Sequence, residues 1–190
     1  VTWGQWDPID GGEKRHVYEQ QFSRKLGPEE PAFGVSWYEA VQYCRWLTLR
    51  SGLPDSDQCY DHSESQSISR QDQPQHWAVH LERRGFRLLT EAEWECACRC
   101  GTCTSYSFGS DPDLRSHYAW SQDNAKRWSH PVGQLRPSLR GLFDIHGNMS
   151  EWTNDWYGGY SPDRMDDPAG IAAGTSRVYR GGSYSLPGDL

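Results

Sequence analysis

The segment from Gly141 to Trp152, with the sequence G-L-F-D-I-H-G-N-M-S-E-W, most constrains what this chain can fold into. It combines two acidic residues, two glycines, an amide and two large aromatic residues. This order fits neither the period of an amphipathic helix nor the alternation of a half-buried strand. Gly147 lies between Asp144 and Glu151, where a glycine lets the backbone turn sharply. We therefore predict a loop that folds back and brings the two carboxylates together.

Carboxylate and carbonyl oxygens gathered in such a loop would suit a hard cation such as calcium. Two acidic side chains are fewer ligands than calcium requires, however. The spacing equally allows a tight turn with solvated acids and a buried Trp152. The pattern of this segment alone leaves both interpretations open.

Three further motifs occur along the chain, and they help to decide between these interpretations. Their sequences are V-S-W-Y-E-A-V-Q-Y-C-R-W-L from Val35, G-F-R-L-L-T-E-A-E-W-E from Gly85 and R-V-Y-R-G-G-S-Y from Arg177. Together with the Gly141 segment and the P-V-G that starts at Pro131, they resemble the formylglycine-generating enzyme family, also called sulfatase-modifying factors. The resemblance runs from the first residue to Tyr184. It implies an α+β, loop-rich, C-type-lectin-like fold with two helices, short antiparallel strands and little regular secondary structure.

Two helices are predicted from the residues themselves, over about residues 36–50 and 90–99. Each begins with a capping box, in which a hydroxyl side chain caps the first turn and a glutamate three residues later reaches back. The pairs are Ser36 with Glu39, and Thr90 with Glu93. In the second helix Trp94 and Cys98 are four residues apart, so both should face the core.

The rest of the chain is predicted to be mostly irregular. Residues 1–35 are expected to be extended, with a turn at the Gly-Gly pair of residues 11 and 12. No helix is expected after residue 101, and residues 177–184 should form a strand that ends in a glycine kink. The polar residues 55–80 are expected to be an inserted surface loop or hairpin. We expect a single domain over residues 1–190, truncated at both ends.

Composition limits the kinds of function that this chain can have. Only 35% of residues are hydrophobic, and the ten tryptophans and ten tyrosines among them predict a core of large amphipathic rings. The net charge of −7 is spread without long runs of one sign, which argues against binding nucleic acid or an anionic membrane. No apolar run is long enough to span a membrane.

Six cysteines raise the question of metal binding and of redox state; they are Cys44, Cys59, Cys96, Cys98, Cys100 and Cys103. The last four lack the paired C-x-x-C spacing of common structural zinc sites, so free thiols are the favoured interpretation. Reduced cysteines fit a cytoplasmic protein. A periplasmic or secreted location remains open, and there the same residues would be candidates for disulfides.

The family resemblance also implies particular calcium ligands. They are the Asp144 side chain, the carbonyl groups of Gly147 and Met149, and the Glu151 side chain. A calcium ion there would have a structural role, since it would hold a loop that no strand ladder holds. For the family's other calcium site the chain offers only Asp123 and Asn124, as weaker candidates. His146, inside the loop, is interpreted as a packing or hydrogen-bonding residue.

The match to the family's enzymes fails at its catalytic positions. Those enzymes oxidise a substrate cysteine to formylglycine with copper(I) held by two cysteines, which are the soft ligands that copper(I) requires. Here Leu186 occupies the first position and the second falls beyond Leu190. Ser150 replaces a tryptophan that lines the enzymes' pocket. Ser183 matches their active-site serine, which is a weak catalytic candidate without the thiolates.

We therefore expect a non-catalytic binding module that contains calcium and no copper. Its ligand, a protein or a small molecule, should bind the C-terminal loops around the Gly-Gly-Ser motif. Such a module could be a recognition or variable-receptor domain of a larger bacterial protein, or a scaffold domain without a ligand. The alternative is a formylglycine-generating oxidoreductase acting on a protein cysteine, with its copper-binding cysteines missing from this chain.

Overall fold

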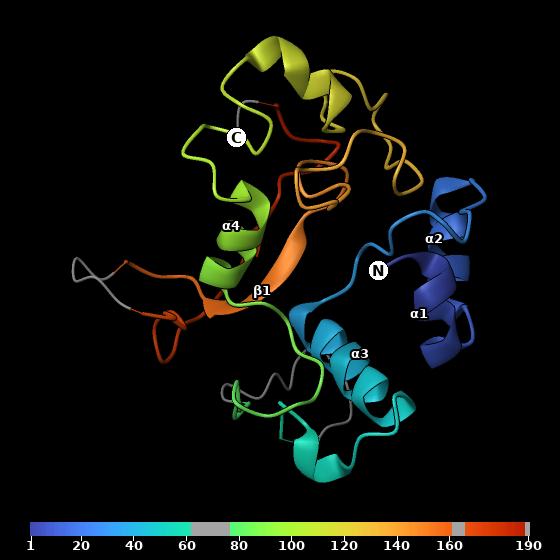
Figure 1. Cartoon of the computed structure of the whole chain (residues 1–190). Coiled ribbons are helices and arrows are strands. Elements are labelled where there is room, and N and C mark those ends of the chain that lie inside the picture. The colour runs from blue at the N-terminus through green and yellow to red at the C-terminus, as the bar shows by residue number, and fades with distance from the viewer. Residues whose placement is uncertain (62–76, 161–165, 189–190) are drawn as a thin grey trace.

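The computed structural model describes residues 1–61, 77–160 and 166–188. Within these residues the α-helices are α1 (Trp3–Asp10), α2 (Glu13–Phe22), α3 (Trp37–Arg50) and α4 (Glu91–Arg99). The described residues also form the 3₁₀ turns η1 (Asp55–Asp57) and η2 (Pro112–His117) and the strands β1 (Glu151–Trp156) and β2 (Arg177–Arg180). Figure 1 shows α4 beside β1, with α1 and α2 at the opposite side of the molecule. The long connections between these elements make the fold loop-rich.

The two helices predicted from capping boxes are confirmed. At α3 the Ser36 hydroxyl accepts a hydrogen bond from the Glu39 N–H at 3.3 Å, and the Glu39 carboxylate accepts one from the Ser36 N–H at 2.7 Å. At α4 the equivalent distances between Thr90 and Glu93 are 3.2 and 2.8 Å. Each box satisfies backbone donors that the first helical turn leaves free.

The prediction of an extended N-terminus is wrong, because residues 3–22 form α1 and α2. The predicted turn at Gly11 and Gly12 is present, with φ angles of 69° and 81°, and residues 24–35 are irregular as expected. Trp3 and Trp6 of α1 are buried, at 0% and 5% exposure. None of the residues of α2 is buried, although Tyr18 and Phe22 stack on each other with ring centroids 6.0 Å apart. The single 3₁₀ turn η2 is likewise an addition to the expected helix-free second half.

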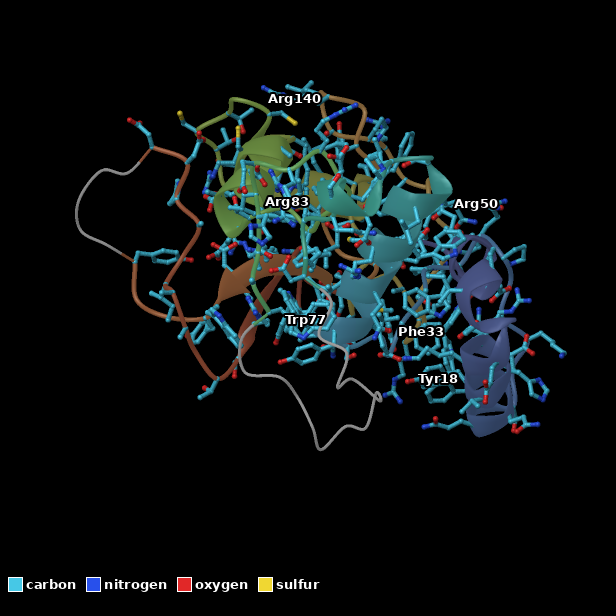
Figure 2. All side chains as sticks on the ribbon, turned by 90° about the horizontal axis from the view of Figure 1, so that it is seen from below. Tyr18, Phe33, Arg50, Trp77, Arg83 and Arg140 are labelled. Carbon is cyan, nitrogen blue, oxygen red and sulfur yellow. The ribbon has the colours of Figure 1, made fainter. Side chains whose placement is uncertain are left out.

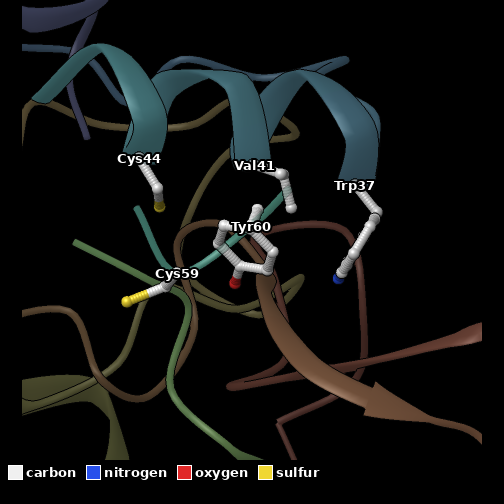
Figure 3. Packing of buried hydrophobic residues seen from close by; sticks show 5 residues of the cluster. All are labelled: Trp37, Val41, Cys44, Cys59 and Tyr60. Carbon is white, nitrogen blue, oxygen red and sulfur yellow. The ribbon is translucent and has the colours of Figure 1, made fainter. Parts of the chain in front are cut away.

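Large aromatic rings are prominent in the core. One cluster contains Trp37, Val41, Cys44, Cys59 and Tyr60, and Figure 3 shows the Tyr60 ring against the face of α3 that carries Val41. A second cluster gathers Trp3, Trp6, Leu26 and Tyr43 between α1 and α3. Beside it lie the rings of Tyr18 and Phe33, whose centroids are 4.9 Å apart (Figure 2).

Residues 55–80 were predicted to be an inserted polar surface loop, but two of them belong to the cluster that packs against α3. Cys59 and Tyr60 are fully buried. The Tyr60 hydroxyl donates to Asn154 Oδ1 at 3.2 Å and accepts from the Leu88 N–H at 3.0 Å. Residues 62–76, which carry most of the predicted insertion, lie outside the described residues.

The two strands pair antiparallel, with Glu151 opposite Arg180, and Trp156 opposite Arg177. The predicted strand over residues 177–184 is therefore shorter than expected, and the chain leaves it through Gly181 and Gly182 at φ angles of 94° and 72°. The Arg177 guanidinium lies between two indole rings, 3.7 Å from the centroid of Trp37 and 3.5 Å from that of Trp156. This contact joins the sheet to α3.

Among the residues that the structure describes, none of the helices is both long and apolar enough to cross a membrane.

Candidate functional site

The Gly141–Trp152 segment folds back as predicted, and Gly147 and Asn148 hold it. At Gly147 the φ angle is 77°, and a Cβ atom there would lie 2.2 Å from the Trp120 carbonyl oxygen, so only glycine fits. The Asn148 side chain is 1% exposed and bonds both backbone groups of His130, each at 3.0 Å. The structural role of Asn148 was not predicted from the sequence, although the Gly147-Asn148 pair could be seen there.

The fold brings Asp144 and Glu151 to one cavity of about 460 Å³. Desolvation by the surrounding protein raises the pKa of the Glu151 carboxyl, and the Asp144 carboxylate raises it further, while the Glu151 side chain remains open to the cavity. The Trp94 Nε1–H donates to Glu151 Oε2 at 2.6 Å. The Gly133 N–H donates to Asp144 Oδ2 at 2.7 Å. Neither acid forms a salt bridge with a lysine or arginine among the described residues.

These features fit the donor set expected for calcium. Met149 lines the same cavity as the two acids, whereas Gly147 lies against a neighbouring, smaller cavity. In the described part of the chain, no loop backbone N–H and no side chain donates to the carbonyl oxygens of Gly147 and Met149. Two carboxyl groups without a basic partner, together with carbonyls without these donors, form an oxygen-rich place that would suit a hard cation. No group of three or more His, Cys, Asp or Glu side chains suited to a metal occurs among the described residues.

The weaker candidates, Asp123 and Asn124, already have partners within the protein. Arg115 donates to Asp123 Oδ2 at 3.1 Å. Asn124 Oδ1 accepts from the Ser121 N–H at 2.8 Å, and its amide donates to the Ala119 carbonyl at 2.9 Å. These bonds shape a tight turn. A second calcium ion at this turn stays a prediction.

A separate cleft of about 530 Å³ lies between α4 and the residues after β2. Its wall includes Trp94, Cys98, His146, Tyr179, Arg180 and Leu186. Trp94, Cys98 and Ile145 form a buried cluster behind it, which confirms that Trp94 and Cys98 face the same side of α4. The cleft therefore contains the C-terminal segment that the sequence predicted to hold a ligand surface.

Cys98 and His146 meet in this cleft, which the sequence did not predict. The Cys98 sulfur lies 3.7 Å from His146 Nε2 and 3.9 Å from Nδ1, so it points at neither nitrogen in particular. The same Nε2 lies 3.0 Å from Ser107 Oγ. Burial raises the pKa of the Cys98 thiol to about 11 and lowers the pKa of His146. At neutral pH this is a protonated thiol beside a neutral imidazole, which is not an activated nucleophile.

The charged residues of the cleft pair with one another. Glu95 accepts from Arg99 Nε at 2.7 Å and from Arg180 at 3.2 Å. The Arg180 guanidinium lies 5.3 Å from the centroid of the Trp94 ring. Arg180 Nε also lies 3.6 Å from Glu91 Oε1, so two acids pair with two arginines at the cleft.

Three positions depart from the enzymes or match them weakly. Of these, Leu186 lines this cleft, whereas Ser150 lines the cavity of Asp144 and Glu151, and Ser183 lines a smaller cavity. Leu186 presents an alkyl side chain to the cleft. The Ser150 hydroxyl donates to the Gly182 carbonyl at 2.8 Å. The Ser183 hydroxyl lies 3.0 Å from that of Ser185. Ser183 is therefore bonded to another serine rather than to a base that could activate it.

This loop-rich α+β architecture is that of the formylglycine-generating enzymes, a C-type-lectin-like fold. The sequence model described as "Sulfatase-modifying factor enzyme 1-like domain" matches residues 2–189, and the chain belongs to this family.

Both solved structures and curated relatives resemble the chain. The structure of Treponema denticola variable protein 1 superposes with a TM-score of 0.83 at 29% identity, covering 100% of this chain and 72% of that one. The formylglycine-generating enzyme of Bos taurus is 29% identical over 192 residues, which are 94% of this chain and 41% of the bovine protein. That of Thermomonospora curvata is 31% identical, over 83% of this chain and 45% of its own length. The chain thus spans less than half the length of these two enzymes.

Proposed function

We propose that this chain is a non-catalytic binding module, stabilised by calcium, whose ligand binds in the cleft between α4 and the residues after β2. It would act as a recognition domain of a larger bacterial protein. The proposal concerns the role of the domain, whereas the family and the fold stand independently of it.

The identity and place of Leu186 carry this proposal. A copper(I) site made of two cysteines needs a thiolate at each position, and an alkyl side chain cannot ligate a metal. Leu186 lies in the wall of the cleft, and Cys98, the cysteine in that wall, has a raised thiol pKa. The cleft therefore has the shape of a ligand site without the pair of thiolates that the family chemistry uses.

Calcium is supported by the geometry of the Gly141–Trp152 segment. Asp144 and Glu151 would supply carboxylate oxygens, and Gly147 and Met149 would supply carbonyl oxygens. The ion would balance the charge of two neighbouring acids; the pKa of Glu151 is raised mainly by desolvation, with a further contribution from the Asp144 charge. Since the loop is fixed by only a few backbone bonds, such a clamp would stabilise it against opening.

Recognition is supported by the walls of the cleft and by one comparison. Trp94, Tyr106, Tyr179 and Arg180 line the cleft, and Trp, Tyr and Arg are the residues enriched at binding hot spots. The Treponema denticola protein with the same fold is titled a variable protein. A variable-receptor role for this chain would place its ligand contacts in this cleft.

The metal content of the purified chain tests the proposal directly. The protein would be prepared with a reductant and without a chelator, and analysed for all metals. We expect about one calcium ion per chain and no stoichiometric copper or zinc. Stoichiometric copper would contradict the proposal, and protein free of calcium with full thermal stability would remove calcium from it.

The alternative, an oxidoreductase of the formylglycine-generating type, is favoured by one observation. Cys98 lies in the cleft beside His146, and several relatives are named as formylglycine-generating enzymes. The test is to incubate the chain with copper(I), oxygen and a peptide that contains cysteine, and to look for an aldehyde product by mass spectrometry. Product that disappears in Cys98→Ala, and persists in the exposed-site control Cys103→Ala, would establish the alternative.

A further inference from the structure

The loop from Val132 to Phe143 is held as one unit by contacts at its base and at its tip. At the base, a Cβ atom on Gly133 would lie 3.9 Å from Phe143 Cδ1, so the two ends of the loop meet. At the tip, the Ser138 N–H donates to the Leu142 carbonyl at 2.8 Å, and the Leu142 N–H donates to the Ser138 hydroxyl at 3.3 Å. The side chains between these contacts are therefore displayed together on one ordered loop, and loops held in this way often carry function.

Four large apolar side chains of this loop are exposed. Leu139 is 81% exposed, Phe143 49%, Val132 38% and Leu142 37%. Such side chains are common singly on protein surfaces, but a group of four within twelve residues forms an apolar patch of the kind that marks an interaction site. The loop therefore offers an apolar contact area that the described residues leave uncovered.

The loop is also positively charged, on a chain whose net charge is −7. It contains Arg136 and Arg140 and no acidic residue. Both arginines are exposed, and neither forms an ion pair with a described residue. Figure 2 shows Arg140 at the outer edge of the molecule. Arginine is enriched at protein interfaces, where its guanidinium group forms strong hydrogen bonds with carboxylates.

The chemistry of this surface favours an acidic protein segment over other polyanions. Nucleic acid and anionic membranes are extended negative surfaces, so the acidic remainder of this chain would repel them. The charges of a short segment act mainly within the Debye length, about 8 Å at physiological salt, so such a segment can pair with the two arginines without approaching the rest of the chain. The tip of the loop also presents leucine, which packs against apolar side chains but offers no ring on which a base could stack.

From these observations we propose that the Val132–Phe143 loop binds a segment of another protein that combines acidic and apolar side chains. The carboxylates of the segment pair with Arg136 and Arg140, and its apolar side chains pack on Leu139 and Leu142. This inference uses neither the carboxylates proposed to bind calcium nor the cleft beside α4. It can therefore fail while the proposed function stands.

Binding of a defined peptide tests the inference. The probe is a capped peptide in which pairs of glutamate alternate with pairs of leucine, titrated into the full chain by calorimetry at about 0.05 and 0.15 M salt. We expect Leu139→Ser/Arg140→Gln to weaken binding about tenfold or more, because it removes an apolar and a charged contact together. Arg136→Gln/Arg140→Gln should weaken it severalfold, with the larger effect at low salt. All three residues are exposed, so circular dichroism and thermal unfolding should show an unchanged fold.

The chain contains a matched control, because Leu49 and Arg50 form a second exposed leucine–arginine pair, at the end of α3. Leu49→Ser/Arg50→Gln should leave peptide binding unchanged. An equal loss of binding in this control would overturn the inference, as would no binding of the peptide by the unaltered chain. Undiminished binding of the same peptide with glutamine in place of glutamate would also overturn it, because the loop would then recognise apolar side chains alone. Equally tight binding of single-stranded DNA or phosphatidylserine vesicles, lost in Leu139→Ser/Arg140→Gln, would overturn it in favour of a polyanion.

Discussion

The Gly141–Trp152 loop, which we propose binds calcium, and the cleft between α4 and the residues after β2 differ in how their charged side chains are paired. In the loop, Asp144 and Glu151 face one cavity without a partner from a lysine or arginine of the described chain, and desolvation raises the pKa of Glu151. In the cleft, Glu91 and Glu95 pair with Arg99 and Arg180, and burial keeps Cys98 protonated. A site with unpaired negative charges favours the binding of a cation, whereas a cleft whose charges are paired can bind a ligand but lacks an activated group.

Trp94 lies between the two regions, and its loss should have the largest effect. Its Nε1–H donates to Glu151, its ring lies beside Arg180, and it is 5% exposed. Trp94→Ala should lower the free energy of unfolding by about 3–5 kcal/mol, with and without calcium, because it leaves a cavity. Denaturant unfolding in calcium and in chelator measures this, and a loss seen only in calcium would mean that the ring serves the loop alone.

Glu151→Gln tests the comparison because the sign of its effect on the free energy of unfolding should depend on calcium. With saturating calcium the variant should lose about 3 kcal/mol, the stabilisation expected at a hundredfold excess of calcium over its Kd. In chelator the change should be small or stabilising. The pKa of Glu151 is raised in the folded state, so its ionisation costs stability as the pH rises above the unfolded value, and glutamine avoids that cost. Thermal unfolding in both buffers tests the assignment, and equal losses would show that Glu151 matters for packing instead.

Gly147→Ala tests whether the loop needs its backbone turn. The residue has a φ of 77°, and the new Cβ would meet the Trp120 carbonyl, so we expect a loss of about 1–3 kcal/mol together with weaker calcium affinity. The matched control is Gly141→Ala, which also has a positive φ but has open space around it. If both variants lose the same stability, strain in φ explains the effect and the close approach to Trp120 does not.

The smallest effect concerns the reactivity of the thiols. Cys96 and Cys103 are exposed, whereas Cys98 is buried and the pKa of its thiol is raised to about 11. At pH 8 an alkylating reagent should therefore modify Cys96 and Cys103 at least tenfold faster than Cys98. Peptide mapping after timed alkylation measures this order. Early modification of Cys98 would show an activated thiol and would strengthen the oxidoreductase alternative.

The sequence predicts those features that depend on contacts between residues close together in the chain. The capping boxes at Ser36 and Thr90 fixed where α3 and α4 begin, since both partners of each bond lie within four residues. The helix α1 was missed although local signals were present: Gln5 Oε1 accepts from the Thr2 N–H at 2.9 Å in a capping box, and Trp3, Trp6 and Ile9 recur every three residues. Tyr60 was placed in a polar surface loop because its neighbours in sequence are polar, whereas its partners are Leu88 and Asn154.

The candidate site divides in the same way. The folding back of the Gly141–Trp152 segment followed from its glycine and its acids, which are close in sequence. The contact of Trp94 with Glu151 and that of Cys98 with His146 join residues about fifty positions apart, and no pattern along the chain announces them. The separation into a cavity with unpaired acids and a cleft with paired charges arises from these distant contacts.

The stacking of Arg177 between Trp37 and Trp156 has a consequence for how this protein can evolve. Trp156 and Arg177 are paired across the sheet, at the two ends of the connection between β1 and β2 (residues 157–176). Their contact therefore closes this connection at its base. Doubling the length of a closed loop costs only about 0.6 kcal/mol. Substitutions or insertions in the connection between β1 and β2 should therefore leave the domain folded. This connection is the part of the chain in which new binding specificities can arise with little loss of stability.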